Sequence, residues 1–330
     1  MKVAINGFGR IGRLTFRSLL NRENIEVVAI NDLTDNYTLA HLLRYDSAHG
    51  RIGADVKANE NSIFIDNTAI TALKEPNPEK LPWKDLDVDI VLECTGRYTD
   101  RESLTKHLTA GAKKVLLSAP AKGDVKTIVL GVNDDTLTAE DTIVSNASCT
   151  TNCLAPMVKV LHNNFGIVKG FMSTIHAYTA DQNLQDGPHK DLRRARAAAQ
   201  NIVPTSTGAA KAIGLVIPEM KGKLDGGALR VPVIDGSLTE LNCVLSRDVT
   251  EDEIKKAFLK SSETDLLNIL QYSDEPLVST DIIGNPYSCI FDAPLTMAFG
   301  NLVRVTGWYD NEFGYSSRLA DLTEFIVNKK

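Results

Sequence analysis

The sequence predicts two domains of different class: an α/β domain built on a doubly wound parallel sheet, and an α+β domain with a mixed, mostly antiparallel sheet. The first half alternates short apolar runs with stretches of helical spacing, as in 3–6 followed by 11–19. The second half carries longer, partly alternating runs such as 168–178 and 302–309. Strands separated by helices imply right-handed crossovers and parallel pairing, whereas alternating strands suit antiparallel pairing. A length of 330 residues fits two domains.

The first domain is expected to contain short buried strands, several of them followed by helices whose apolar residues share one face. The expected strands are 3–6, 27–30, 88–92, 115–117, 128–130 and 142–146, and the expected helices are 11–19, 39–43 and 101–110.

The second domain is expected to hold long strands and several helices, with one long irregular segment. The expected strands are 168–178, 241–246 and 302–309, and the expected helices are 149–163, 208–216, 251–261 and 312–330. Residues 180–200 lack apolar periodicity and are rich in charge, so we expect a long ordered loop, and loops of that length usually serve function.

The composition narrows the class of protein. Hydrophobic residues make up 43% and charged residues 24%, with a net charge of −6, so a nucleic-acid or anionic-membrane role gains no support. The N-terminus lacks the apolar run of a signal peptide, and no run of about 18 apolar residues exists. Five cysteines are an odd, sparse set that indicates reduced thiols and a cytoplasmic location. We expect no metal site.

A glycine-rich turn follows the first expected strand. Residues 7–12 have the pattern G-x-G-x-x-G and open a helix, and Asp32 ends the next strand twenty residues after Gly12. This is the context of the dinucleotide-binding (Rossmann) fingerprint, whose glycines allow a tight turn and close backbone approach to a pyrophosphate. Asp32 would accept hydrogen bonds from the adenosine ribose hydroxyls and repel a 2′-phosphate, which favours NAD over NADP.

Cys149 is the candidate nucleophile. It opens the expected helix 149–163, where unpaired N–H groups and the helix dipole stabilise negative charge, so we expect the pKa of its thiol to lie below that of free cysteine. The polar neighbours Ser148 and Thr150 argue against a buried structural thiol. A thiolate nucleophile needs a base. His176, at the end of a strong strand signal, is the candidate, but its residue pattern alone does not pair it with Cys149 or exclude a structural histidine.

Four segments resemble the phosphorylating glyceraldehyde-3-phosphate dehydrogenases: NGFGRIGR at 6–13, ASCTTNC at 147–153, TIHAYT at 174–179 and WYDNE at 308–312. The likeness extends over essentially the whole chain. It implies that Cys149 is the nucleophile and His176 its base. It also implies a glycolytic oxidation of glyceraldehyde 3-phosphate with NAD and inorganic phosphate, giving 1,3-bisphosphoglycerate through a thioester.

The same resemblance implies the domain boundaries and the assembly. Residues 1–148 and 312–330 would form the NAD-binding Rossmann domain, and 149–311 the catalytic domain. The loop near 178–201 would line the cofactor site of a neighbouring subunit in a homotetramer. Its basic run 193–196 would then be interface and structural, with a solvated charged face as the alternative.

Individual site residues carry over from the family by position. The resemblance implies that the cofactor contacts Gly7, Gly9, Arg10, Ile11, Gly12, Asp32, Thr95, Gly96, Ser118, Asn311 and Tyr315. It implies one anion site for the substrate's C3 phosphate, formed by Thr179, Asp181 and Arg230, with Asp181 orienting the guanidinium. It implies a second anion site for the attacking phosphate, formed by Ser148, Thr150, Thr207 and Gly208.

One departure from the family pattern, the role of one cysteine and three rival functions stay open. Many relatives carry an arginine near the adenine, and segment 74–78 has none. Cys153 is read as structural, with oxidative coupling to Cys149 as the alternative. The rival functions are an erythrose-4-phosphate dehydrogenase, an NADP-preferring biosynthetic form, and a surface-binding or nucleic-acid-binding protein. Thr207 and Gly208 argue against the first, Asp32 against the second, and the acidic composition against the third.

Overall fold

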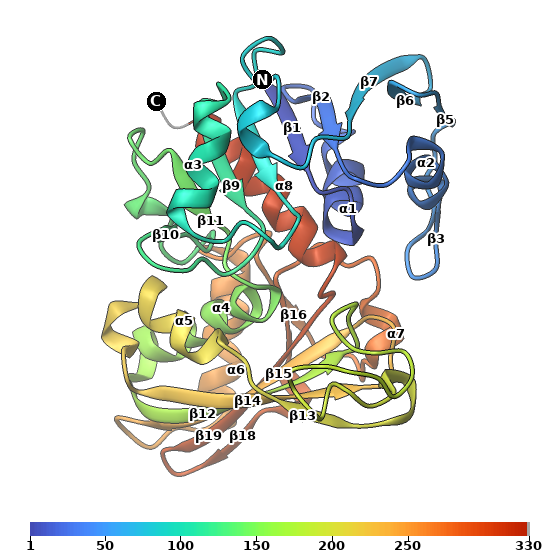
Figure 1. The fold of residues 1–330 in the computed structure, drawn as a ribbon. Coiled ribbons are helices and arrows are strands. Elements are labelled where there is room, and N and C mark those ends of the chain that lie inside the picture. The colour runs from blue at the N-terminus through green and yellow to red at the C-terminus, as the bar shows by residue number, and fades with distance from the viewer. Residues whose placement is uncertain (329–330) are drawn as a thin grey trace. The chain divides into compact units, whose positions relative to one another are not determined.

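The computed structural model describes residues 1–328, which divide into two compact units (Figure 1). Unit 1 comprises Met1–Ile128, Asp135–Ala147 and the chain from Ser316 onward, and unit 2 comprises Val129–Asp134 and Ser148–Tyr315. Among residues 1–328, no helix combines the length and apolar character needed to cross a membrane.

Unit 1 is built on a nine-stranded sheet of order β10-β11-β9-β8-β1-β2-β7-β6-β5. Its pairs are parallel from β10 to β7 and antiparallel from β7 to β5. The strands are β1 (Lys2–Asn6), β2 (Glu26–Asn31), β5 (Val56–Ala58), β6 (Ser62–Ile65), β7 (Thr68–Leu73), β8 (Ile90–Glu93), β9 (Lys114–Leu117), β10 (Lys126–Thr127) and β11 (Ile143–Ser145). A two-stranded ribbon joins β3 (Tyr45–Asp46) and β4 (Gly50–Arg51).

The order of strands places a topological switch point between β1 and β8. From β1 the chain first adds β2 on one side and later adds β8 and β9 on the other. Open α/β sheets bind ligands at the carboxyl ends of the strands at such a point. The end residues of three neighbouring strands, Asn31, Asn6 and Glu93, are register partners in one row.

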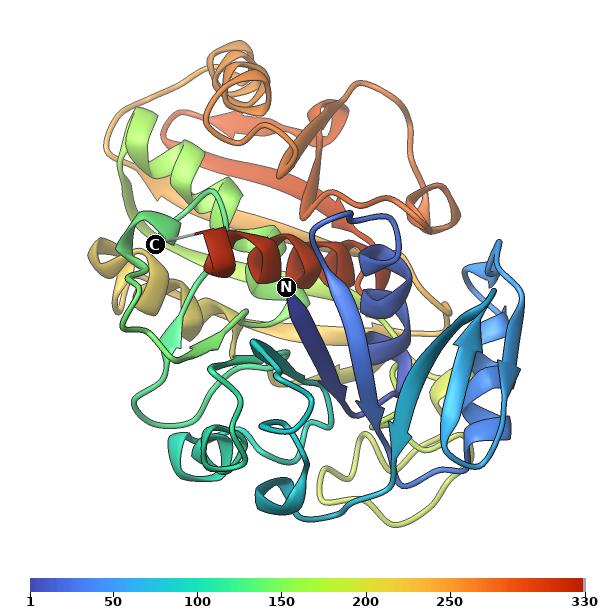
Figure 2. The same cartoon turned by 90° about the horizontal axis from the view of Figure 1, so that it is seen from above.

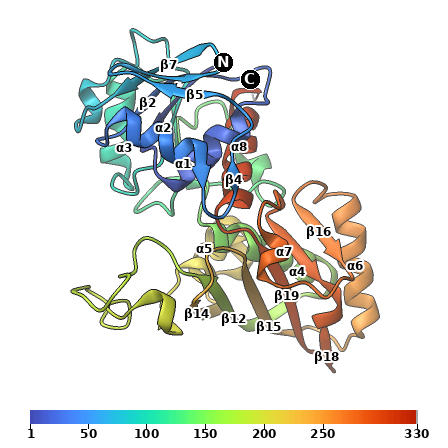
Figure 3. The same cartoon turned by 90° about the vertical axis from the view of Figure 1, so that its right-hand side faces the viewer.

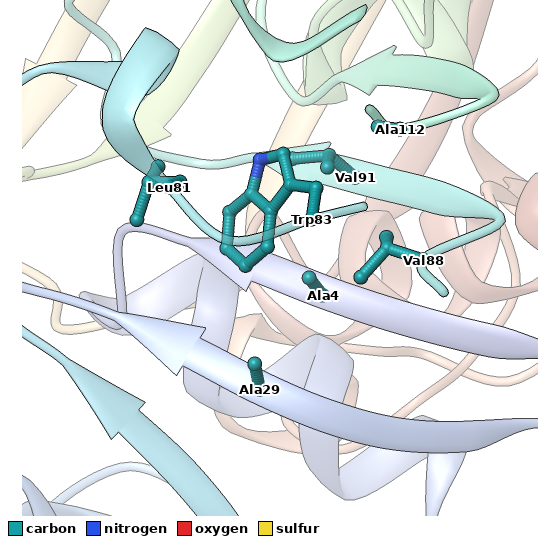
Figure 4. Close-up of a cluster of buried hydrophobic side chains, with 7 residues drawn as sticks. All are labelled: Ala4, Ala29, Leu81, Trp83, Val88, Val91 and Ala112. Atoms are coloured by element: carbon teal, nitrogen blue, oxygen red, sulfur yellow. The ribbon is translucent and has the colours of Figure 1, made fainter. Parts of the chain in front are cut away.

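The helices of unit 1 include α1 (Arg10–Leu19), α2 (Asn36–Arg44) and α3 (Arg101–Thr109), and α8 (Phe313–Asn328) returns to this unit from Ser316. Side-chain caps from Asp35 and Asp100 begin α2 and α3. Figure 2 shows α8 beside α1, where Arg22 bonds Glu324 at 2.5 Å. Trp83 is fully buried against Ala4, Ala29 and Val91 of the sheet (Figure 4).

Unit 2 is built on an eight-stranded sheet of order β13-β14-β12-β15-β19-β17-β16, with β18 paired to β19. The strands are β12 (Ile167–Ala177), β13 (Val203–Thr205), β14 (Leu224–Val231), β15 (Ser237–Leu245), β16 (Leu270–Ser273), β17 (Cys289–Asp292), β18 (Met297–Phe299) and β19 (Leu302–Tyr309). The helices are α4 (Cys149–Phe165), α5 (Ala209–Val216), α6 (Glu251–Glu263) and α7 (Ser279–Ile282). Helix α4 packs against β15, β17 and β19 (Figure 3).

The predicted fold class is confirmed, with a largely parallel sheet in unit 1 and a mostly antiparallel mixed sheet in unit 2. One expected strand, 128–130, is wrong: the segment is a buried turn after β10, because an apolar run alone does not distinguish a strand from a buried connection. The strands β3 to β7, β10, β13, β14 and β16 to β18 were not expected. The expected helix 312–330 corresponds to α8, and its last two residues lie outside the described chain.

Candidate active site

A cavity of about 330 Å³ lies in unit 1 at the switch point. Its walls come from the turn after β1, the ends of β2 and β7, and the turn after β8. The lining residues are Asn6, Gly7, Gly9, Asn31, Asp32, Leu33, Thr34, Glu75, Pro76, Pro78, Cys94, Thr95, Arg97 and Tyr98.

The glycine turn of this cavity has the shape that a pyrophosphate requires. Gly7 has φ +92°, and a Cβ there would lie 2.6 Å from the Thr95 nitrogen. A Cβ on Gly12 would lie 2.2 Å from the Gly7 oxygen, which fixes close packing of α1 on the turn. Gly9 caps α1 without a side chain, and a Cβ on it would meet nothing within 4 Å. An open, side-chain-free helix N-terminus in a cavity wall suits a phosphate group, so the turn fits a dinucleotide.

Asp32 is held rigidly in the cavity wall. One carboxylate oxygen accepts the Phe8 N–H at 2.8 Å, and the other accepts the Thr34 N–H at 2.9 Å. The Phe8 bond ties the end of β2 to the glycine turn. A carboxylate with both oxygens bonded to the backbone cannot turn away from a ligand, so its negative charge stays at the cavity.

In unit 2, Cys149 is the first residue of α4. The Ser148 hydroxyl caps this helix by accepting the Thr151 N–H at 3.0 Å, and it also bonds the Thr151 hydroxyl at 2.7 Å. Ala147, just before the cap, has φ +57°, a left-handed conformation that is unusual for a residue with a Cβ. The turn and cap together present the Cys149 thiol at the helix N-terminus.

His176 lies near the end of β12, with its Nε2 3.5 Å from the Cys149 sulfur. Parallel pairing makes Arg230 of β14 the register partner of His176. The Arg230 guanidinium lies 2.6 Å from His176 Nδ1 and donates to the Ala177 carbonyl at 3.1 Å. The same carbonyl lies 2.7 Å from Nδ1. Either tautomer therefore finds a partner at Nδ1: the Ala177 carbonyl accepts from Nδ1–H, or Nδ1 accepts from Arg230.

The electrostatics of the pair differ from the sequence expectation. Burial raises the pKa of the Cys149 thiol, against the opposing effects of Arg230 and Thr150. The expected lowering is therefore wrong: burial outweighs the helix N-terminus, even though Cys149 remains partly exposed. Burial, and then the Arg230 charge, lower the pKa of His176 to about 3. With the pKa of Cys149 raised and that of His176 lowered, the neutral forms of both side chains, thiol and imidazole, are favoured.

A buried hydroxyl cluster lies behind this pair. The Tyr309 hydroxyl lies 3.0 Å from the Thr150 hydroxyl and 2.9 Å from that of Thr174, and its ring meets the His176 ring edge-on at 5.9 Å. Sequence reasoning missed Tyr309 and Thr174, although Tyr309 falls in the WYDNE segment and Thr174 in TIHAYT. The Thr150 hydroxyl is thereby turned toward Tyr309.

The residues expected to bind the substrate phosphate, Thr179, Asp181 and Arg230, lie near the ends of β12 and β14, but Asp181 has a different partner from the one expected. Asp181 bonds Thr179 and Arg194, so the expectation that it orients Arg230 directly is wrong. Against the effect of burial, the Thr179 hydrogen bond and then the charge of Arg230 lower the pKa of the Asp181 carboxyl, and this charge is the only action of Arg230 on it. The buried Nε of Arg230 has no hydrogen-bond partner among the described residues. Arg194, expected to be structural, joins this group.

The remaining predicted residues take the following places. Thr207 and Gly208 precede α5, and the Thr207 hydroxyl accepts the Ala209 N–H at 3.2 Å. Asn311 is buried, and its side-chain oxygen accepts from Ser237 at 2.5 Å. Of the predicted cofactor residues, Gly7, Gly9, Asp32 and Thr95 line the cavity, whereas Arg10, Ile11, Gly12, Gly96 and Ser118 belong to unit 1 outside the lining, and Asn311 and Tyr315 belong to unit 2. The lining residues Leu33, Arg97 and Tyr98 were not expected.

This fold and these sites define a two-domain, dinucleotide-binding oxidoreductase. Residues 148–311 match the profile described as "Glyceraldehyde 3-phosphate dehydrogenase, C-terminal domain", and residues 1–101 match its "NAD binding domain". The glyceraldehyde-3-phosphate dehydrogenase of Streptomyces coelicolor is 57% identical over 100% of this chain and 99% of its own length. "Glyceraldehyde-3-phosphate dehydrogenase 2" of Streptomyces avermitilis is 56% identical with the same coverage, and the enzyme of Mycolicibacterium smegmatis is 56% identical over 99% and 98%. The chain belongs to the glyceraldehyde-3-phosphate dehydrogenase family.

Proposed function

We propose that the chain oxidises glyceraldehyde 3-phosphate to 1,3-bisphosphoglycerate, with NAD as hydride acceptor and inorganic phosphate as acyl acceptor, through a thioester on Cys149. The observation that carries the proposal is the 3.5 Å approach of His176 Nε2 to the Cys149 sulfur at the start of α4. A nucleophile and base within reach, with the base held by a third group, is the general arrangement of covalent catalysis.

The first half of the reaction forms and oxidises a hemithioacetal. The sulfur of Cys149 bonds to the aldehyde carbon as the thiol proton moves to His176 Nε2, and that proton then passes to the new alkoxide. His176 next removes the hydroxyl proton while hydride leaves the same carbon, which converts the adduct to a thioester. Bound NAD supplies the acceptor for this hydride. The steps in which His176 takes up a proton require Nε2 to be unprotonated, which holds in the tautomer whose Nδ1–H donates to the Ala177 carbonyl.

The second half releases the product. A phosphate oxygen attacks the thioester carbon, the C–S bond breaks, and the leaving sulfur takes the proton held by His176. We propose that Arg230 and Thr179 bind the substrate's own phosphate and that Thr207, Gly208 and the N-terminus of α4 bind the attacking phosphate. The buried, unpaired Nε of Arg230 supports an anion at the first place, since a buried donor needs an acceptor.

We propose NAD rather than NADP as the preferred cofactor. Asp32, fixed by the Phe8 and Thr34 N–H groups, offers its remaining lone pairs to ribose hydroxyls and repels a 2′-phosphate. Asn311, whose oxygen is already bonded to Ser237, has its amide N–H₂ left to donate to the nicotinamide carboxamide.

We also propose that the chain assembles as a homotetramer and acts in the cytoplasm. Large apolar side chains at Phe171, Phe299 and Leu302 are 69%, 85% and 50% exposed, which supports burial by another copy. Light scattering coupled to size exclusion should give about four times 36.0 kDa. A monomer at micromolar concentration would refute the assembly.

The function is tested by NADH absorbance with glyceraldehyde 3-phosphate and NAD, with and without phosphate or arsenate. We expect turnover that depends on the anion and that exceeds turnover of erythrose 4-phosphate. Turnover independent of the anion would indicate hydrolysis, and a preference for erythrose 4-phosphate would indicate the rival substrate.

A further inference from the structure

A row of buried polar side chains reaches the dinucleotide cavity through Asn6 and Asn31, and the proposed chemistry does not use it. Asn31, Asn6 and Glu93 end the neighbouring strands β2, β1 and β8 at the switch point. All three are at least 95% buried, and Glu93 is fully buried. Behind Glu93 lie His107 of α3 and Trp83, both fully buried.

The hydrogen bonds of this row donate from Asn31 to Asn6 and from Asn6 to Glu93, and the contacts of Asn31 with Glu75 fix this direction. The Asn31 side chain donates to the Glu75 carbonyl and accepts the Glu75 N–H, both at 2.9 Å, so its amide cannot flip. Its amide nitrogen also donates to the Asn6 oxygen at 2.7 Å. Asn6 must therefore turn its own amide nitrogen toward Glu93, to which it donates at 2.6 Å.

At the other end of the row the hydrogen bonds also point toward Glu93. The Trp83 indole N–H, which can only donate, bonds His107 Nδ1 at 3.0 Å. His107 must then carry its proton on Nε2, which lies 3.0 Å from the same Glu93 oxygen that accepts from Asn6. Trp83 is held in place by the apolar cluster of Figure 4, so this end is rigid as well.

The second oxygen of Glu93 holds the turn after β8. It accepts the Thr95 N–H at 2.8 Å and the Thr95 hydroxyl. Donors from β1, α3 and this turn thus converge on one carboxylate. Three of the chain segments joined by the row, at Asn6, Glu75 and Thr95, line the dinucleotide cavity.

We propose that Glu93 is a positioning residue for cofactor binding: it is the shared acceptor that holds the turns after β1 and β8 in the shape a dinucleotide needs. The family's cofactor, NAD, serves as the probe, and in that respect the inference rests on the proposed function. A carboxylate is required, because only an ionised carboxylate of this size offers two oxygens, both of which accept and neither of which donates. A negative charge under a pyrophosphate site is otherwise unfavourable, so geometry rather than attraction explains its presence.

The decisive variant is Glu93→Gln, which keeps the shape and adds an amide donor. If the amide nitrogen of the introduced glutamine took the place of the oxygen that accepts from Asn6 and His107, it would face two fixed donors. The amide nitrogen should therefore take the place of the other oxygen, where it faces the Thr95 N–H. The conflict then falls on the turn that lines the cavity. By calorimetry on the full chain we expect NAD to bind about tenfold more weakly or worse, which corresponds to about 1.4 kcal/mol.

The matched control is Asp292→Asn in unit 2. Asp292 is also a buried carboxylate that accepts from an indole N–H, that of Trp308 at 2.8 Å, and a backbone N–H, that of Leu295 at 3.2 Å. We expect it to leave NAD affinity within about twofold of wild type while lowering stability. The rate of Cys149 alkylation without NAD should change in neither variant. Wild-type NAD affinity in Glu93→Gln, or an equal loss in both variants, would overturn the proposal.

A measurement on the wild-type chain keeps the inference testable if Glu93→Gln does not fold. With ¹⁵N-labelled histidine, the His107 ring should show the neutral Nε2–H tautomer, and its Nε2 signal should shift when NAD is added. An Nδ1–H tautomer, or signals unmoved by saturating NAD, would overturn the proposal. If wild-type chain binds no NAD at all, the proposed cofactor fails, while the tautomer still tests the direction of the row.

Discussion

Replacing Arg230 by methionine separates the two roles that the structure gives this side chain. The guanidinium sits 2.6 Å from His176 Nδ1 and keeps a buried Nε without a partner. Methionine retains much of the volume and removes the charge. We expect the variant to bind the substrate phosphate poorly and to change the protonation of His176.

The size of the first effect follows from the lost bond. A hydrogen bond to a charged group contributes about 1.5–3 kcal/mol. At about 1.4 kcal/mol per factor of ten, kcat/KM for glyceraldehyde 3-phosphate should fall about 10- to 150-fold at neutral pH, chiefly through KM.

The second effect follows from electrostatics. Burial and then the Arg230 charge lower the pKa of His176 to about 3. Removing the cation stabilises the imidazolium, so the pKa rises and less of the base is available as pH falls. Because burial, the larger cause, remains, the pKa stays below its usual value, and kcat/KM of the variant should fall below wild type only toward the acid end of the assayed range.

The assay is initial-rate NADH formation from pH 5 to 9 with NAD and phosphate saturating. Arg230→Lys is the control, since it keeps a cation near His176 and should show the smaller change in pH profile. An unchanged KM for glyceraldehyde 3-phosphate together with a wild-type pH profile would refute both roles of Arg230.

Three further predictions use the same structure. Asp32→Gly should weaken NAD binding and improve NADP relative to NAD in kcat/KM; a wild-type chain that already prefers NADP would contradict it. Ser237→Ala should lower the free energy of unfolding by about 1–3 kcal/mol, because the Ala177 N–H that bonds Ser237 at 3.0 Å is left unpaired. It should also weaken NAD binding, because the Asn311 side chain loses the hydrogen bond that orients it. Unchanged urea denaturation and an unchanged NAD affinity by calorimetry would show that Ser237 has neither role. In the folded chain the pKa of His176 is about 3, below the unfolded value of about 6.5, so between pH 6.5 and pH 4 only the unfolded wild-type chain takes up a proton. Wild type therefore loses stability on acidification, and His176→Asn should gain about 3 kcal/mol relative to it over that range. A difference in the free energy of unfolding that does not depend on pH would contradict the neutral imidazole.

Local chemistry allowed much of the molecule to be predicted from sequence. The glycine turn at 7–12 and Asp32 fit one structural context, and Gly7 and Asp32 line the same cavity. Cys149 could be placed at a helix start because polar residues precede an apolar-periodic stretch. His176 could be placed at a strand end, but its approach to the sulfur depends on the pairing of β12 with its neighbours, which residue patterns do not specify.

The parts that sequence reasoning missed depend on long-range pairing and on burial. Asn6 and Glu93 are 87 residues apart and meet only because β1 and β8 are adjacent. In the sequence, Asn6 and Glu93 each look like an ordinary polar residue at the end of a strand. The direction of the Cys149 pKa shift is missed for a related reason: the helix start is visible in the sequence, whereas the partial burial of the thiol depends on the fold around it.

The most direct test of the central claim is a single-turnover experiment without phosphate. The chain is mixed with NAD and glyceraldehyde 3-phosphate, quenched in acid, digested and examined by mass spectrometry. We expect a 3-phosphoglyceryl thioester on the peptide containing Cys149, one equivalent of NADH per acylated site, and loss of the acyl group when phosphate is added. NADH formation without acylated Cys149, or acylation at another cysteine such as Cys94, would contradict it.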